Sequence, residues 1–245
     1  MTIQLMAEHG VVCRLQNEKR GYFGWPTVVR LEDGTLIVAS SGLRSTHVCP
    51  WGKTVLNVSY DDGRTWSAPR VINDSPLDDR DAGIVALGGD RLLVSWFVTD
   101  NRPHLDDAHL RELFGDEEAE SWHATLDALT DEIVERHQGS WVMLSADAGA
   151  TWSAPIRVPV SSPHGPIRLA NGELLYLGKP FGTAKDMRDA VITAAASRDG
   201  GHTWQKMGEV PLYPGTISGS YHEAHVLELP SGKLIGAIRL EDCPG

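Results

Sequence analysis

Apolar residues along this chain of 245 residues gather in short runs that are separated by Gly, Asp and Asn, and one arrangement of them returns four times. In each copy two apolar runs flank a brief turn, which is the pattern of a β-hairpin. The copies lie at 28–38, 84–94, 166–176 and 225–236. The pattern predicts an all-β chain that is assembled from repeated hairpins.

A second repeat, S-x-D-x-G-x-T-W, alternates with these hairpins at 59–66, 145–152 and 197–204. Its Asp can bind the backbone N–H groups ahead of it, its Gly tolerates positive φ, and its Trp is a large apolar anchor. It therefore predicts a second hairpin tip in each unit. Two hairpins make a four-stranded blade, and repeats of this length are typical of propellers, solenoids or arrays.

The interval between the second and third copies of the first hairpin is longer than the other two. The leucines that end the first runs lie 56, 82 and 60 residues apart, so the middle step carries a surplus of about 24 residues. Within that interval apolar residues recur at helical spacing: Trp122, Leu126, Leu129, Ile133 and Val134. We expect a helical insert at 105–137 between two strands of blade two. Covering apolar surface is its expected role, with a roof over one face or a dimer contact as alternatives.

Charge excludes some partners. The 33 acidic against 22 basic residues give a formal charge of −11, which argues against nucleic acid and against an anionic membrane surface. Residues 1–10 show no secretory signal, and no apolar run is long enough to span a bilayer. We expect a cytoplasmic protein without membrane or nucleic-acid partners. Both a monomer and a homo-oligomer are compatible with the sequence.

The repeated S-x-D-x-G-x-T-W phrase is similar to the Asp-box, and the chain resembles the sialidase-like β-propellers that carry it. The resemblance implies six blades, of which about three and a half are present. Because six blades need about 350 residues, we expect residues 1–245 to be a single propeller domain that is truncated at its C-terminus. In that family the Asp-boxes lie away from the active site, so they indicate the fold and not the chemistry.

The stretch 221–239 resembles the sialidase segment in which a Glu opens an inner strand and an Arg closes the next one. By that resemblance Glu223 activates the nucleophile, and Arg239 is one of three arginines that clamp the substrate carboxylate. A guanidinium fork suits such a carboxylate. The alternative is that Glu223 and Arg239 form a structural ion pair.

The chain departs from the family pattern elsewhere. Gly24 occupies the place of a clamp arginine, and the loop at 40–53, where the family carries its acid/base Asp, has no acidic residue. That loop offers Arg44, His47 and Lys53 instead. The family's nucleophilic Tyr and its third clamp Arg belong to late blades, which we expect this chain to lack.

Replacements are available at the same rim. We expect Arg80 and Arg44 to join Arg239 in binding an anion, Asp81 to act as an acid, and His47 to serve as proton donor, since imidazole titrates near neutrality. The alternatives are a solvated turn at Arg80 and Asp81, and an idle loop histidine. His222 and His225 are three residues apart on a strand and point to opposite faces, so we expect no metal there and no cofactor.

These observations lead to an expected function. The chain is expected to be a sialidase-type glycoside hydrolase that releases a terminal carboxylate-bearing sugar, sialic acid first, from glycans. One alternative is hydrolysis or elimination at a uronic acid, with His47 or His222 as base. The other is a non-catalytic propeller that binds glycans or a protein. Fold analogy alone does not choose among them.

Overall fold

The computed structural model describes residues 8–181 and 189–241, apart from the side chain of His104. The expectation that the chain carries no secretory signal rests in part on residues 1–7. The expectation of a C-terminal truncation rests in part on residues 242–245. Both segments lie outside the described residues. Among those described, no helix combines the length and the apolar character that crossing a membrane requires.

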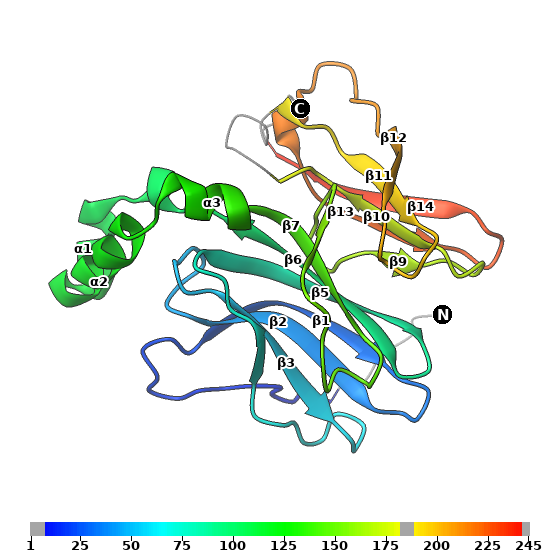
Figure 1. Cartoon of the computed structure of the whole chain (residues 1–245), viewed down its shortest axis with the longest axis horizontal. Coiled ribbons are helices and arrows are strands. Elements are labelled where there is room, and N and C mark those ends of the chain that lie inside the picture. Colours follow the sequence, from blue (N-terminus) through cyan, green and yellow to red (C-terminus); the bar gives the residue numbers. More distant parts are fainter. Residues whose placement is uncertain (1–7, 182–188, 242–245) are drawn as a thin grey trace, which may run out of the picture.

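The described chain is mostly β and contains four small antiparallel sheets, in which the strands follow one another in chain order (Figure 1). The first sheet consists of β1 (Tyr22–Arg30), β2 (Leu36–Arg44), β3 (Lys53–Ser59) and β4 (Arg70–Asn73). The second consists of β5 (Asp78–Gly88), β6 (Arg91–Thr99), β7 (Gly139–Ser145) and β8 (Ile156–Val158). The third consists of β9 (Ile167–Arg168), β10 (Leu174–Gly178), β11 (Thr193–Ser197) and β12 (Gln205–Glu209), and the fourth of β13 (Tyr221–Glu228) and β14 (Leu234–Leu240).

Each predicted first hairpin forms the first two strands of a sheet, and each S-x-D-x-G-x-T-W repeat begins at the last residue of a third strand. In the first repeat the Asp61 carboxylate accepts hydrogen bonds from the Thr65 amide at 2.8 Å and the Thr65 hydroxyl at 2.6 Å. Gly63 has φ +83°, and its carbonyl accepts a bond from the Trp66 indole at 3.1 Å. The other two copies repeat these bonds, so the local turn chemistry is the same in all three.

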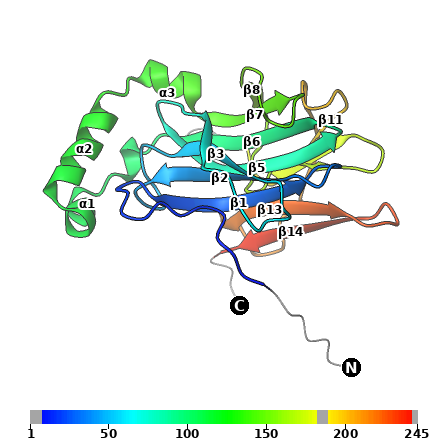
Figure 2. The ribbon, with the colours of Figure 1, turned by 90° about the horizontal axis from the view of Figure 1, so that it is seen from below.

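The long interval contains a short 3₁₀ helix η1 (Arg102–His104) and three helices: α1 (Asp107–Phe114), α2 (Asp116–Asp127) and α3 (Asp131–His137). They project from one end of the sheets, between β6 and β7 (Figures 1 and 2). Trp122 of α2 packs edge-to-face on Trp51 of the 45–52 loop, with ring centroids 5.7 Å apart. Val134 of α3 joins the core between the first two sheets. The insert is thus held by apolar contacts at two places.

The sheets follow one another along an open arc (Figure 1), and their facing sides form the core. The first strands β1, β5 and β9 contact one another in turn, and β13 contacts β10, the second strand of the third sheet. Leu56 and Trp96 belong to the core between sheets one and two, and Leu93 and Tyr176 to the core between sheets two and three. This convergence brings the beginnings of β1, β5 and β13 near each other.

Candidate functional site

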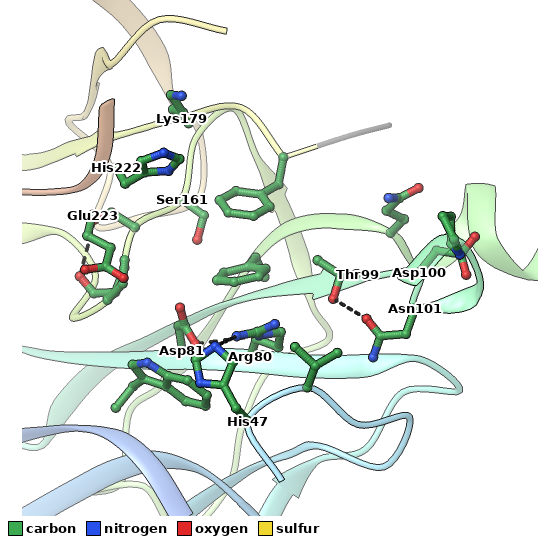
Figure 3. Close-up of a pocket in the computed structure, with 18 of the residues that line it drawn as sticks. His47, Arg80, Asp81, Thr99, Asp100, Asn101, Ser161, Lys179, His222 and Glu223 are labelled. Carbon is green, nitrogen blue, oxygen red and sulfur yellow. Dashed lines mark hydrogen bonds and ion pairs between the residues drawn. The ribbon is translucent and has the colours of Figure 1, made fainter. Parts of the chain in front are cut away.

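A cavity of about 1080 Å³ lies where β1, β5, β13 and the insert meet. Five of the six predicted site residues line it: His47, Arg80, Asp81, Glu223 and Arg239. In Figure 3 Glu223 and His222 lie on one side, and Asp81, Arg80 and His47 lie on the other. The sequence positions of these residues differ by as much as 192, so only the fold brings them together.

A β-bulge is repeated at this cavity in three of the four first strands. The pairing register shifts between Gly24 and Thr27, between Arg80 and Gly83, and between His222 and His225. One residue in each bulge has positive φ: Trp25 at 51°, Asp81 at 52° and Glu223 at 49°. Such a conformation costs on the order of 1–3 kcal/mol for a residue with a side chain and tends to occur at functional sites. Bulges re-aim side chains, and all three of these residues line the cavity.

Trp25 is a cavity residue that was not predicted from the sequence, although the repeats contain a signal for it. Trp25, Asp81 and Glu223 each precede the leucine that ends their hairpin's first run by six residues. Comparing the repeats at this offset, and not only at their turns, places Trp25 beside the two carboxylates.

Asp81 is an unusual carboxyl group because it is buried and its Oδ1 accepts no hydrogen bond from any described residue. The nearest cation is the Arg80 Nε, 3.9 Å from Oδ1, which is a long contact. Burial raises the pKa of Asp81 to about 6, and the charges of Arg80 and Arg44 limit that rise. A carboxyl group with this pKa is substantially protonated in mildly acidic solution, as a general acid requires.

Arg80 lies between two aromatic rings. Its guanidinium carbon is 5.1 Å from the centre of Trp25 and 5.7 Å from that of Phe97, both within the range of a cation–π contact. Its Nη2 also lies 3.4 Å from Nε2 of His47. Arg80 is therefore held in place with one side facing the cavity.

His47 lies against the edge of Trp25, with ring centroids 4.9 Å apart. Burial, together with the charges of Arg80 and Arg44, lowers the pKa of His47, so the ring is neutral at pH 7. Since arginine only donates, the contact with Arg80 makes Nε2 an acceptor. This arrangement favours His47 as a proton acceptor, whereas Asp81 is the group with the properties of a donor.

Glu223 differs from Asp81 in its surroundings. Its Oε1 lies 2.8 Å from Nη1 of Arg239, and the exposed fractions of the two side chains are 39% and 50%. Arg239 also reaches Oε1 of Glu241 at 2.7 Å through its other terminal nitrogen. Glu223 therefore has a guanidinium partner and access to solvent, whereas Asp81 has neither a close ion-pair partner nor much exposure. The cavity thus combines one buried carboxyl group with a raised pKa and one half-exposed carboxylate in an ion pair.

Arg44 lies outside the cavity, contrary to the expectation that it binds substrate. Its side chain is fully buried, with Nη1 2.7 Å and Nη2 2.9 Å from the two oxygens of Asp78. It also donates to the carbonyls of Thr46 and His47. A Cβ at Gly52 would lie 2.0 Å from Nη1 of Arg44, so only glycine allows the loop to close over this pair. The polar loop is folded around Arg44, which fixes the backbone of His47.

Further basic residues line the same cavity, among them Lys179 and His222. Lys179 of the third sheet donates to the Ser218 carbonyl at 2.7 Å, and burial lowers its pKa. His222 lines this cavity, while His225 lines a separate hollow with His164, so the two histidines lie on opposite faces as expected. Within residues 8–181 and 189–241, no cluster of three or more His, Cys, Asp or Glu side chains is arranged to hold a metal.

No family model matches the sequence. Among solved structures, the chain is similar to a protein of unknown function from Dyadobacter fermentans, with a TM-score of 0.66 and 18% identity over 95% of this chain and 65% of that one. It is also similar to the NanB sialidase from Streptococcus pneumoniae, with a TM-score of 0.63 and 14% identity over 97% of this chain and 51% of that one. A leech intramolecular trans-sialidase is similar as well, with a TM-score of 0.62 and 15% identity over 96% of this chain and 50% of that one. The chain therefore spans between half and two thirds of the length of these neighbours. Identities this low show the fold alone, and that fold is sialidase-like.

Proposed function

We propose that this protein is a glycoside hydrolase of the sialidase type, which releases a terminal carboxylate-bearing sugar from glycans, with sialic acid as first choice. The observation that supports it most is the presence, in one cavity, of the buried Asp81, whose pKa is raised to about 6, and of Glu223 in an ion pair with Arg239. A buried carboxyl group with a raised pKa can act as the acid of a hydrolase, while a second carboxyl group in the same cavity can act as its base. The sheets are proposed to be consecutive blades of a six-bladed propeller with Asp-box turns.

Each group has a role in this proposal. Arg80 and Arg239 bind the sugar carboxylate, since guanidinium groups pair strongly with it. Asp81 gives its proton to the oxygen of the leaving group as the glycosidic C–O bond breaks. Glu223 takes a proton from the nucleophile, and water completes the hydrolysis.

The nucleophile itself is not among these side chains. Sialidases use a Tyr, which is exceptional among glycosidases, and no tyrosine of the described residues lines the cavity. In this proposal Glu223 activates either a water molecule or a hydroxyl group from outside the described residues.

A second candidate function has one observation in its favour. His47 is neutral and accepts from Arg80, which suits a base that removes a proton beside the carboxylate of a uronic acid. That reaction would be an elimination on the same scaffold, with the sugar carboxylate again on arginine.

A direct comparison of substrates separates these functions. The full-length protein is incubated with fluorogenic sialosides and uronides, with Asp81→Asn as the inactive control. Release from sialosides that the variant abolishes supports the proposal, while an unsaturated product from uronides supports the elimination. Binding of either sugar without any product would show a non-catalytic protein and overturn both.

A further inference from the structure

Arg80 and Asp81 are neighbours in the sequence that do not form a close ion pair. The Arg80 Nε lies 3.9 Å from the Asp81 Oδ1, which is beyond hydrogen-bond distance, although the exposed fractions of the two side chains are only 13% and 8%. Neither of these two atoms has a hydrogen-bond partner among the described residues. Opposite charges that have lost their water are expected to pair closely. Some other contact must therefore keep these two groups apart.

The other two arginines that line the cavity in the described part of the chain are held by carboxylates. Nη2 of Arg102 lies 2.9 Å from Asp100, and Nη1 of Arg239 lies 2.8 Å from Glu223. A carboxylate at this distance positions a guanidinium group, but it also offsets the charge and occupies N–H donors. Arg80 lies instead against two aromatic rings, which attract a cation without neutralising it. Its charge thus stays available to a ligand.

Trp25 is the ring that is best placed to control Arg80. Its centre lies 5.1 Å from the Arg80 guanidinium carbon, compared with 5.7 Å for Phe97, and indole is the aromatic group that attracts cations most strongly. The same ring packs on the edge of His47 and lies 5.4 Å from the guanidinium carbon of Arg44. Because the buried ion pair of Arg44 is fixed, Trp25 rests on a rigid support.

From these contacts we infer that Trp25 is a positioning residue that holds Arg80 away from Asp81, so that the arginine stays free for an anion and the acid stays free of an ion pair. The inference rests on the proposed function for the roles of Arg80 and Asp81 in the reaction. The β1 bulge, at which Trp25 has φ 51°, directs the ring into the cavity. Without this ring Arg80 would close on Asp81, and the cavity would lose a free cation and an acid together.

The test follows the titration of the Asp81 carboxyl group by NMR in the full-length protein, with Asp81→Asn to assign the signal. We expect the pKa of Asp81 to fall by about 1–3 in Trp25→Leu, which is the effect of an opposite charge at close range. Trp25→Tyr keeps an aromatic face and should retain most of the wild-type value. An unchanged pKa in Trp25→Leu would overturn the inference.

Trp141→Leu is the matched control. The Trp141 ring lies 4.4 Å from the guanidinium carbon of Arg157, so it makes the same kind of contact, but neither residue lines the cavity. The pKa of Asp81 should therefore stay at its wild-type value in this variant. A fall as large as that in Trp25→Leu would overturn the inference, because it would show a general effect of losing a tryptophan.

An Arg80→Met background separates positioning from exposure. Removal of Trp25 also admits solvent to Asp81, which by itself lowers the pKa of a buried carboxyl group. If Arg80 is the cause, Trp25→Leu should leave the pKa of Asp81 unchanged in the Arg80→Met protein, whereas a fall of equal size in both backgrounds would overturn the inference. Trp25→Met, with a flexible side chain that fills irregular space, replaces Trp25→Leu if the latter does not fold. The other titratable and charged groups around this pair are present in every variant: Arg44, His47, Asp78 and Glu223.

A kinetic arm links the position of Arg80 to catalysis. Because a general acid must be protonated, kcat falls as pH rises through its pKa, and Trp25→Leu should move this decrease to lower pH. KM for an aryl sialoside should rise about tenfold, as for the loss of one charge-assisted hydrogen bond. A decrease at the wild-type pH would overturn the inference. If the wild type has no turnover, the proposed function fails, and the NMR titration alone still decides the role of Trp25.

Discussion

At the scale of single residues, the site depends on a difference between two carboxyl groups. Asp81 is buried next to unfavourably placed donors, and Glu223 is half exposed beside Arg239. Burial raises the pKa of Asp81 to about 6, whereas Glu223 has an arginine partner and contact with solvent. Trp25 and Phe97 complete this arrangement by holding Arg80 between their rings.

The first prediction concerns the pH dependence of stability. The folded pKa of Asp81, about 6, lies above its unfolded value of 3.8, so the folded state binds more protons between these values and loses stability as pH rises from about 4 to about 6. The loss is at most about 3 kcal/mol. Thermal unfolding of Asp81→Asn should therefore show a smaller decrease in Tm over this range than the wild type.

A second carboxyl group acts in the same direction, because burial raises the pKa of Asp79 to about 7. The wild type and Asp81→Asn should both lose stability towards pH 7, and only their difference reports on Asp81. Parallel Tm curves for the two proteins would contradict the burial of an ionisable Asp81.

The second prediction concerns the contribution of Arg44 to the unfolding free energy. Arg44→Met leaves Asp78 charged, buried and without its guanidinium partner, which typically costs 3–5 kcal/mol in unfolding free energy. Arg30→Met is the matched control because Arg30 forms an exposed pair with Asp62 in the same sheet region, and such pairs contribute about 0–1 kcal/mol. Urea denaturation measures both. Similar small effects would show that Arg44 does not hold the loop.

At the scale of elements, the repeated turns and the insert have different roles in the structure. The S-x-D-x-G-x-T-W turns stabilise the third-to-fourth strand connections, and none of their described residues lines the cavity. The insert adds a wall to the cavity and packs on the 45–52 loop. The residues that line the cavity thus come mainly from the starts of first strands and from the insert, and not from the repeated turns.

The third prediction tests one such turn. Hydrogen bonds from Thr151 and then Ser145 lower the pKa of Asp147 to about 2, so its ionised form stabilises the fold above pH 4 and this contribution is lost as pH falls from about 4 to about 2. Asp147→Ala should lower Tm at pH 7 and reduce the further decrease on acidification. Asp127→Ala, at an exposed position in α2, should do neither. Catalytic activity in Asp147→Ala should stay unchanged below its Tm, and a selective loss would contradict a purely structural turn.

Much of the element pattern could be predicted from the sequence because its causes are local. Gly63, Asp61 and Thr65 determine their turn within five residues, and the helices of the insert follow from apolar spacing. The residues that line the cavity were harder to predict from the sequence. The bulges at Trp25, Asp81 and Glu223 depend on tertiary pairing, and the burial of Arg44 depends on Asp78, which lies 34 residues away in sequence.

At the scale of the whole molecule, the fourth sheet leaves an apolar face exposed in the described structure. Leu227 and Ile235 pair directly across β13 and β14, and their exposed fractions are 59% and 48%. Residues opposite each other in this way share one face of a sheet, and exposed apolar patches promote association.

The fourth prediction follows from this face. The 245-residue chain should self-associate as its concentration rises, and Leu227→Lys with Ile235→Lys should reduce this association in light scattering. Tyr60→Lys, at an exposed turn position, should leave it unchanged. Equal association by all three proteins would show that another surface is responsible.

The central claim is that Glu223 is a catalytic base, and the turnover of Glu223→Gln by the full-length protein tests it most directly. We expect a loss of about 10²–10⁴-fold in kcat on a sialoside, the range for a lost general base, with little change in Tm. Glu241→Gln, which removes the other carboxylate on Arg239 but does not line the cavity, should keep most of the activity. A Glu223→Gln protein that melts at a lower temperature and keeps its turnover would contradict the account, because Glu223 would then be only a structural partner of Arg239.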